Sequence, residues 1–259
     1  MNILLTNDDG ITSPGLHSAY RALTMAGHTV TAVAPDRERS GQSHSVNFFA
    51  YLQVTEVKMP DGSIGYSVNG TPADCSHLGC FALAKDPVDL VVSGINTDTN
   101  LGYDANYSGT VAAALEAVAN GFPALAVSQE RSPEPDWALA GKLTKEAVNL
   151  FHGWGIPTGV LVNMNIPAHV TDPAWIWVPL NLNAVREYYV VDVDSEGKKR
   201  YKRTRDEKYC VVDPGSDIDL SRQGRITLSP LGPVRSERDT LARLRSQTFE
   251  TRRASGSGL

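Results

Sequence analysis

Two adjacent carboxylates, Asp8 and Asp9, stand directly behind a short apolar run near the start of the sequence. That run, Ile3-Leu4-Leu5, is closed by turn-forming residues, which predicts a strand buried on both faces of a parallel sheet. Open α/β sheets bind their ligands at the carboxyl ends of such strands. Two neighbouring anions repel each other, and a divalent cation would offset that repulsion because hard cations take carboxylate oxygens. A solvated Asp-Gly turn is the alternative interpretation.

Polar segments also follow the next two predicted core strands. Arg39-Ser40-Gly41 comes after the strand predicted over residues 28–34, and Ser93-Gly94-Ile95-Asn96 comes after the strand over residues 87–92. The carboxyl ends of parallel strands share one edge of the sheet, so these segments should meet the two carboxylates. Hydroxyl groups and backbone donors beside arginines could complete a metal shell or hold a phosphate, although the first segment could also be a simple loop.

A third kind of signal is the turn Ser108-Gly109-Thr110, which opens a helix predicted over residues 111–120 and closed by Gly121. The unpaired amides at a helix start favour an anion. Small side chains permit its close approach. An ordinary capping turn is the alternative interpretation.

The elements that must position these groups begin with a strand, a helix and a second strand in the first 34 residues. Ser13 is a predicted N-cap with Pro14 at the first helical position, and Gly27 ends the helix. The repeated rhythm predicts an α/β fold with a Rossmann-like three-layer core and a mostly parallel sheet. The first turn has no Gly-x-Gly-x-x-Gly sequence, which disfavours a nicotinamide or flavin cofactor. Further elements are predicted as an edge hairpin over residues 52–68, strands over 123–128 and 158–163, and a helix over 135–153.

The chain changes character after Pro167. A long β-hairpin is predicted from strands over residues 184–193 and 199–212. It carries a basic cluster of six residues, Lys198, Lys199, Arg200, Lys202, Arg203 and Arg205. Such ribbons are marginal alone, and a weakly apolar terminal helix is predicted from Ser236, so both are expected to pack on a partner subunit. A solvated charged arm is the alternative. We therefore divide the chain into a catalytic core, 1–167, and an oligomerisation region, 168–259, comprising a β-arm, a returning strand and the terminal helix.

Length and composition narrow the class further. A chain of 259 residues can bury a substantial core, and a formal charge of -5 disfavours a nucleic-acid polymer as partner. Cys75, Cys80 and Cys210 lack Cys-x-x-Cys spacing, which favours reduced thiols over a structural zinc site. The first strand begins at residue 2, leaving no room for a signal peptide, and no apolar run approaches the ~20 residues of a membrane helix. A cytoplasmic protein without membrane contact is expected.

The order and spacing of these motifs resemble those of the SurE family (survival protein E), metal-dependent phosphatases described as 5′- and 3′-nucleotidases. The resemblance covers nearly the whole chain. It is carried by Ile3–Gly10, Ala34–Gly41, Gly70–Cys75, Ser93–Asn96, Tyr107–Ala113, Asn163–Pro167 and Ile226–Leu231.

The resemblance implies a ligand set of Asp8, Asp9, Ser40 and Asn96 for one divalent cation per subunit, Mg²⁺ or Mn²⁺. Two carboxylates, a hydroxyl and an amide oxygen suit such hard ions. Asp8 and Asp9 are the expected catalytic residues. The expected phosphate-binding residues are Asn96, Ser108, Gly109 and Thr110. A homodimer or homotetramer formed by exchange of C-terminal elements is also implied.

Two segments depart from the family pattern. The family commonly has a Gly-x-Asn-x-Gly type of loop after Asn96, whereas this chain has Thr97–Gly102 with an additional carboxylate at Asp98. Leu115-Glu116-Ala117 stands where the family often has Arg-Glu-Gly. Both departures bear on substrate preference.

Hydrolysis of nucleoside 5′-monophosphates, and also of 3′-monophosphates, is therefore the expected reaction. Metal-activated water is favoured over an aspartyl-phosphate intermediate, because the Asp-x-Asp pair of haloacid-dehalogenase-type phosphatases is absent. The alternatives are a non-catalytic nucleotide sensor, a sugar-nucleotide transferase, and an exopolyphosphatase that uses the same site.

Overall fold

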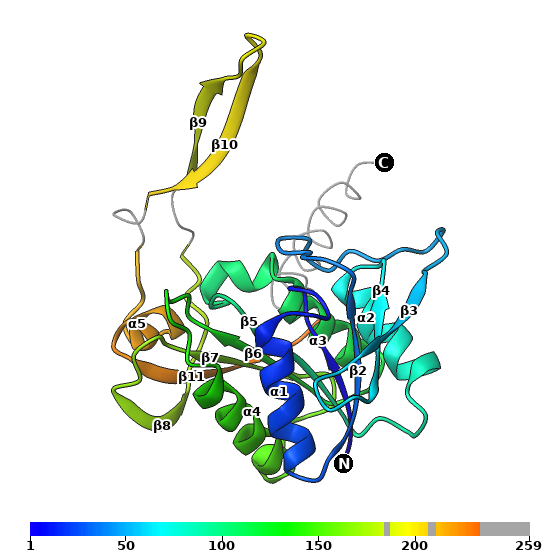
Figure 1. Ribbon diagram of the computed structural model, residues 1–259. Coiled ribbons are helices and arrows are strands. Elements are labelled where there is room, and N and C mark those ends of the chain that lie inside the picture. Colours follow the sequence, from blue (N-terminus) through cyan, green and yellow to red (C-terminus); the bar gives the residue numbers. More distant parts are fainter. Residues whose placement is uncertain (184–186, 207–210, 234–259) are drawn as a thin grey trace, which may run out of the picture.

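The computed structural model describes residues 1–183, 187–206 and 211–233. Within them, nine strands form one sheet in the order β3-β4-β2-β1-β5-β6-β7-β11-β8 (Figure 1). The strands are β1 Asn2–Thr6, β2 Thr29–Pro35, β3 Val54–Lys58, β4 Ile64–Val68, β5 Leu90–Asn96, β6 Ala124–Gln129, β7 Leu161–Ile166, β8 Asp172–Trp177 and β11 Arg225–Leu231.

The middle of this sheet is parallel. All six strands from β4 to β7 run in one direction, while β3 at one edge and the pair β11 and β8 at the other introduce antiparallel neighbours. Ile3, Leu4 and Leu5 of β1 are almost completely buried. The prediction of a mostly parallel sheet with a two-sided buried first strand is therefore confirmed.

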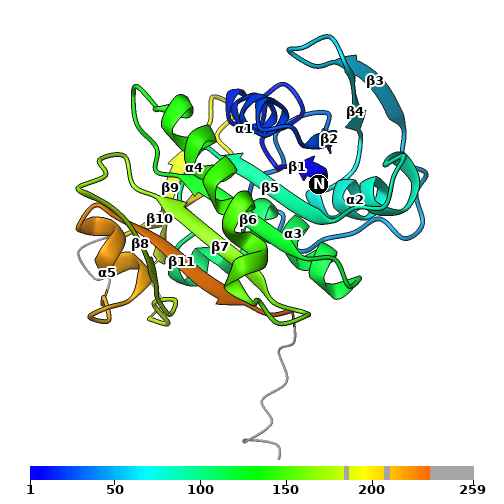
Figure 2. The ribbon, with the colours of Figure 1, turned by 90° about the horizontal axis from the view of Figure 1, so that it is seen from below.

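Helices cover both faces, which gives the predicted three layers (Figures 1 and 2). On one face α1 Pro14–Met25 and α4 Trp137–Phe151 pack over Ile3 and Leu5. On the other face α2 Pro72–Leu78 and α3 Gly109–Ala119 pack over Leu4. The remaining helical segments are the π-helix η1 Gly79–Leu83, the 3-10 helices η2 Gly102–Asn106 and η3 His152–Trp154, and α5 Asp217–Arg222.

N-cap residues fix where the helices near the site begin. The Ser13 side chain accepts a hydrogen bond from the Leu16 amide, and Thr71 forms a capping box with Asp74. The Ser108 side chain accepts from the Val111 amide at the start of α3. Each capping bond satisfies an amide that the first helical turn leaves without a partner. The carboxyl ends of β1 and β5 are thus connected by fixed turns to α1 and α3.

Two strands of the main sheet differ from the sequence-based boundaries by three or more residues. β5 continues through Ser93–Asn96, which we expected to follow the strand, because a register shift against β6 lets this buried polar segment stay in the sheet. β7 begins at Leu161 and not at residue 158, because Gly159 adopts a positive φ of 82° in a turn before the strand. Pairing with β6 and β11, rather than local propensity, sets this boundary.

The predicted hairpin is confirmed as β9 Glu187–Val193 and β10 Lys199–Arg205, which form a separate two-stranded ribbon projecting from the body (Figure 1). The second strand is shorter than the predicted 199–212, because its pairing with β9 ends at Arg205 opposite Glu187. The helix predicted from Ser236 and the thiol of Cys210 lie outside the described residues. The division of the chain at Pro167 stays a prediction, and β8 and β11, which follow it, extend the main sheet. Among the described residues, no helix has both the length and the apolar character needed to cross a membrane.

Candidate active site

A cleft of about 630 Å³ opens at the carboxyl ends of the parallel strands. Segments following β1, β2, β5 and β6 all contribute to it, as the shared strand direction predicts. Its lining residues are Asp8, Asp9, Glu38, Ser40, Gly41, Asn96, Thr97, Asp98, Thr99, Asn100, Asp104, Tyr107, Ser108, Arg131 and Arg205.

Asp8 is the point at which three segments of the chain meet. Its side chain is buried, and its Oδ1 atom accepts a hydrogen bond from the Thr110 hydroxyl. The backbone amide of Arg39 donates to the Asp8 carbonyl oxygen at 2.8 Å, which anchors the turn that carries Ser40. Gly109 packs directly on the carboxylate, where an added Cβ would lie only 2.7 Å from the Asp8 Cβ. The close approach of α3 to Asp8 therefore requires glycine at this position.

Asp9 is held by the loop after β5. The amide and hydroxyl of Thr97 donate to its Oδ2 atom at 3.1 and 3.0 Å. The Asn96 side-chain Nδ2 donates to the Asp98 carbonyl oxygen at 2.7 Å. A side-chain amide nitrogen only donates, so the Asn96 Oδ1 atom is the one that can ligate a cation, and the hydrogen bond from Nδ2 fixes the orientation of the amide.

Both carboxylates are costly to ionise where they lie. Burial raises the pKa of Asp8 to about 6, while the Thr110 hydrogen bond opposes the shift. Burial also raises the pKa of Asp9, and the hydrogen bonds from Thr97 oppose it. Ionised carboxylates in such a place need positive charge nearby.

The cleft supplies little positive charge of its own. Arg131 opposes the rise in the pKa of Asp9, but more weakly than the hydrogen bonds from Thr97. The cleft contains five carboxylates and two guanidinium groups. Arg131 pairs with Asp98 at 3.5 Å, and Arg205 pairs with Asp104. Across the described ranges, no Lys or Arg forms an ion pair with Asp8, Asp9 or Glu38, and no group of three or more His, Cys, Asp or Glu could by itself hold a metal ion. A cation here would therefore need the hydroxyl and amide oxygens as well, and such an all-oxygen set fits Mg²⁺ or Mn²⁺.

The sequence-predicted residues fall into two groups in space. The first group lines the cleft and comprises Asp8, Asp9, Ser40, Asn96 and Ser108. Gly109 and Thr110 instead lie beneath it, against Asp8, and both are buried. The Thr110 hydroxyl thus orients a carboxylate and does not face the open cleft.

Comparison with known proteins identifies the family. The family model described as "Survival protein SurE" matches residues 3–186. The chain belongs to the SurE family.

Relatives and a solved structure extend the match beyond those residues. A protein of Pelotomaculum thermopropionicum named "5'-nucleotidase SurE" is 39% identical over 89% of this chain and 89% of its own length. One of the same name from Desulfovibrio desulfuricans is 40% identical over 89% of this chain and 92% of its own. The crystal structure of the SurE protein from Aquifex aeolicus superposes with a TM-score of 0.80 at 30% identity, covering 96% of this chain and all of that one.

A buried amide network behind the cleft of this SurE-family chain was not anticipated. The backbone amide of Asn100 donates to Asn165 Oδ1 at 2.7 Å, and the Asn100 side-chain Nδ2 donates to the Ser128 hydroxyl at 2.7 Å. The backbone carbonyl oxygen of Asn100 accepts from Asn163 Nδ2 at 2.8 Å. All four residues are buried. The network ties the loop after β5 to β6 and β7 and so fixes the backbone that carries Asn96 and Thr97.

Sequence reasoning also missed several residues that line the cleft. Glu38 and Arg131 follow β2 and β6, so the rule that located the other ligands would have found them. Thr97 carries no signal of its own, because its role depends on where Asp9 lies. Arg205 comes from the end of β10 on the projecting hairpin, and the only signal for it was the basic character of that arm.

Proposed function

We propose that this chain is a metal-dependent phosphomonoesterase that hydrolyses nucleoside 5′-monophosphates, and also 3′-monophosphates, to a nucleoside and phosphate. The relatives named 5'-nucleotidase support the reaction. The observation that carries the proposal is the cleft itself, where Asp8, Asp9 and Glu38 have no ion-paired cation among the described residues. An anionic phosphate would be repelled from such a surface unless a cation were bound first.

The residues that would hold this cation are Asp8, Asp9, Ser40 and Asn96, through oxygen atoms. A single Mg²⁺ or Mn²⁺ would supply Lewis-acid stabilisation of the phosphoryl oxygens and lower the pKa of a water molecule. The hydrogen bonds from Thr110 to Asp8 and from Thr97 to Asp9 fix the orientation of both carboxylates before any ligand arrives. Such pre-ordering reduces the entropy cost of binding.

The start of α3 would bind the phosphate. Ser108 lines the cleft at the helix N-terminus, where backbone amides and the helix dipole favour an anion. Asp8 or Asp9 would accept the proton of the attacking water. The water oxygen bonds to phosphorus as the bond from phosphorus to the ribose oxygen breaks, and the leaving oxygen takes a proton from solvent. Asn96 would contact both the cation and the phosphate.

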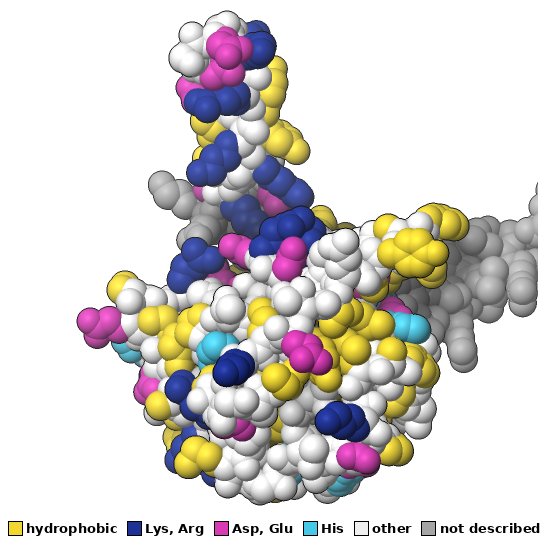
Figure 3. Space-filling model, turned by 45° about the vertical axis from the view of Figure 1, so that its right-hand side comes forward, with side chains coloured by type: hydrophobic (Ala, Val, Ile, Leu, Met, Phe, Trp, Pro, Cys, Tyr) yellow, Lys and Arg dark blue, Asp and Glu magenta, His cyan; other side chains and the backbone are white. Residues whose placement is uncertain are grey.

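Polyphosphate hydrolysis at the same cleft is less well supported. Four of the six basic residues at the hairpin form ion pairs: Lys198 with Glu196, Arg200 with Asp192, Arg203 with Glu187 and Arg205 with Asp104. Figure 3 shows basic and acidic side chains interspersed along the projecting arm. The arm therefore presents a largely neutralised surface and not a track for a polyanion.

We also propose that the chain forms a homodimer or homotetramer through its C-terminal elements. Tyr189, Val191, Val193 and Tyr201 share one face of the hairpin by strand register, and all are exposed in a single chain. The same face also carries Glu187, Lys199, Arg203 and Arg205, so it is mixed in character. Exposed apolar side chains on a projecting ribbon nevertheless favour contact with another subunit. Light scattering after size-exclusion chromatography should give two or four times the mass of one chain, and a monomeric mass would contradict the proposal.

A phosphate-release panel tests the reaction. We expect release from AMP or GMP in Mg²⁺ or Mn²⁺, loss of release with a chelator, and much slower release from tripolyphosphate. Asp9→Asn should lower the rate by at least about 100-fold with an unchanged circular dichroism spectrum. Asp98→Asn, which removes a carboxylate already paired with Arg131, is the matched control and should change the rate far less. Binding of AMP without release under every metal would instead indicate a nucleotide sensor.

A further inference from the structure

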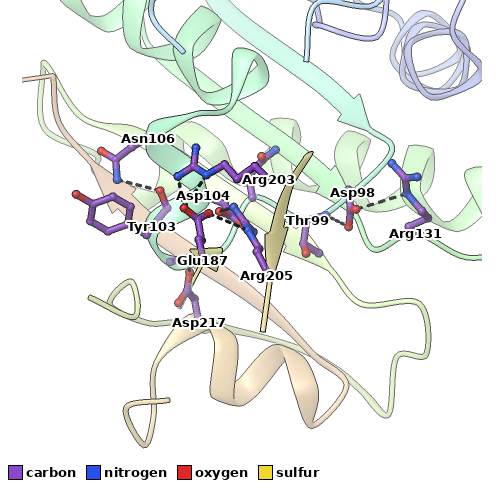
Figure 4. Close-up of polar contacts among 12 residues, drawn as sticks. Asp98, Thr99, Tyr103, Asp104, Asn106, Arg131, Glu187, Arg203, Arg205 and Asp217 are labelled. Carbon is purple, nitrogen blue, oxygen red and sulfur yellow. Dashed lines mark hydrogen bonds and ion pairs between the residues drawn. The ribbon is translucent and has the colours of Figure 1, made fainter. Parts of the chain in front are cut away.

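The base of the projecting hairpin reaches into the cleft. Arg205, the last residue of β10, lines the same cleft as Asp8 and Asp9. Its two terminal guanidinium nitrogens donate to the two carboxylate oxygens of Asp104 in η2, a bidentate arrangement (Figure 4). Bidentate pairs fix direction as well as charge, so the plane of the Arg205 guanidinium is held in place. The guanidinium therefore forms part of the cleft wall, although its strand belongs to the projecting ribbon.

A series of side-chain contacts links Arg205 to a second residue of the cleft, Tyr107. Glu187 of β9 accepts from Arg205 Nε at 3.3 Å and from Arg203 Nε at 2.7 Å. The Arg203 guanidinium carbon lies 5.4 Å from the centre of the Tyr107 ring. Tyr107 lines the cleft directly before Ser108. The base of the hairpin therefore contacts both ends of the segment from Asp104 to Tyr107. We define the hairpin wall as five residues: Asp104, Tyr107, Glu187, Arg203 and Arg205.

The chemistry of this wall differs from that of the metal-binding end of the cleft. Its two arginines face two carboxylates, so its formal charges cancel, whereas no Lys or Arg of the described residues forms an ion pair with Asp8 or Asp9. A second phosphate group would find no unpaired cation on this wall within the described residues. Of the wall, only Asp104, Tyr107 and Arg205 line the cleft, and Arg203 covers one face of the Tyr107 ring. The flat Arg205 guanidinium and the exposed part of the Tyr107 ring instead offer planar surfaces on which an aromatic base stacks. The wall thus suits the uncharged, planar part of a substrate.

We propose that Arg205 is a specificity-determining residue, and that the hairpin wall binds the nucleoside part of a nucleotide while the metal-binding end holds its phosphate. This inference rests on the proposed nucleotidase function and names how the substrate lies in the cleft. It also gives the hairpin a part in substrate selection. Arg205 acts by contact with the nucleoside and not on the reacting phosphate.

Arg205→Gln tests the assignment, with AMP as substrate and inorganic phosphate as competitive inhibitor. Loss of the planar guanidinium surface should raise the KM for AMP about tenfold, as expected for one stacking contact. The inhibition constant of inorganic phosphate, which reports the phosphate end alone, should stay within about twofold of the wild-type value. Arg200→Gln is the matched control, because Arg200 makes the same type of ion pair with Asp192 farther out on the hairpin. It should leave both constants unchanged.

Equal weakening of AMP and inorganic phosphate in Arg205→Gln would show that the wall only orients the phosphate-binding turn, and would overturn the proposal. An unchanged KM for AMP would also overturn it. Failure of the proposed function has a different signature, because the wild-type protein would then release no phosphate from AMP. Circular dichroism of each variant verifies that the fold is retained.

Discussion

At Asp8, burial and a neighbouring carboxylate oppose ionisation, whereas a hydrogen bond favours it. The carboxylate is buried, stands beside a second carboxylate and accepts a hydrogen bond from Thr110. The sequence identified Asp8 and Asp9 because an abrupt change from apolar to acidic residues is a local signal. It did not identify Thr110 as a partner of Asp8, since that contact joins residues 102 positions apart. Side-chain types can be predicted from a short segment, whereas the partners that tune them depend on the completed fold.

The raised pKa of Asp8 gives a stability prediction for the protein in chelator. The pKa rises from 3.8 to about 6 on folding, so the folded state binds the proton more tightly. The contribution of Asp8 protonation to the free energy of unfolding is therefore fully present below about pH 4 and is lost as pH rises through about 6. Asp8→Asn should be more stable than wild type by up to about 3 kcal/mol at pH 8, with little difference at pH 3.5. Urea denaturation at both pH values measures this.

Bound metal should make the wild type more stable than Asp8→Asn at pH 8, the reverse of the order expected in chelator. At pH 8, Mn²⁺ should raise the denaturation midpoint of the wild type and have little effect on Asp8→Asn, because a bound ligand stabilises only the state that binds it. A wild type that is more stable than Asp8→Asn in chelator at pH 8 would contradict the burial argument.

Gly109 supplies a second prediction at the level of single residues. A Cβ at this position would lie 2.7 Å from the Asp8 Cβ and 2.9 Å from Asp8 Oδ2, so Gly109→Ala must displace α3 or the carboxylate. Overpacking of this kind costs about 1–3 kcal/mol, and phosphate release should fall as well. Gly153→Ala is the matched control, since an added Cβ there meets no atom within 4 Å. Thermal unfolding and phosphate release together test it, and equal behaviour of the two variants would refute the close-approach argument.

At the level of elements, the βα units were largely predictable and the contacts between them were not. Apolar periodicity and capping residues located β1, α1 and α3, because those signals lie within one segment. The continuation of β5 through Asn96 and the start of β7 at Leu161 depend on pairing with neighbouring strands. The network around Asn100 escaped prediction for the same reason, because its members come from β6, β7 and a loop.

That network should support the loop after β5. Asn165→Ala removes the acceptor of the Asn100 amide and leaves a buried donor without a partner. The expected cost is about 1–3 kcal/mol of stability, with reduced metal affinity because the loop carries Asn96 and Thr97. Asn183→Ala, which removes an exposed hydrogen bond to Asp213, should have little effect on either quantity. Chemical denaturation and Mn²⁺ titration compare the two variants, and equal losses would show that the network has no special role.

At the scale of the whole molecule, one edge of the sheet gathers the ligands and a distant ribbon completes the cleft. The first part follows from parallel strand direction, so the sequence predicted that Asp8, Asp9, Ser40 and Asn96 would line one cleft, as they do. The second part does not, because no local pattern states where the end of β10 will lie. The SurE family match and the superposition on the Aquifex aeolicus protein place the chain within one fold family.

The central claim is that these four residues together bind one divalent cation. Isothermal titration of Mn²⁺ into the chelator-treated and dialysed protein tests it most directly. We predict one site per chain in the wild type, at least about tenfold weaker binding in Ser40→Ala and Asn96→Ala, and no measurable binding in Asp9→Asn. Unchanged Mn²⁺ binding in Asp9→Asn would contradict the account.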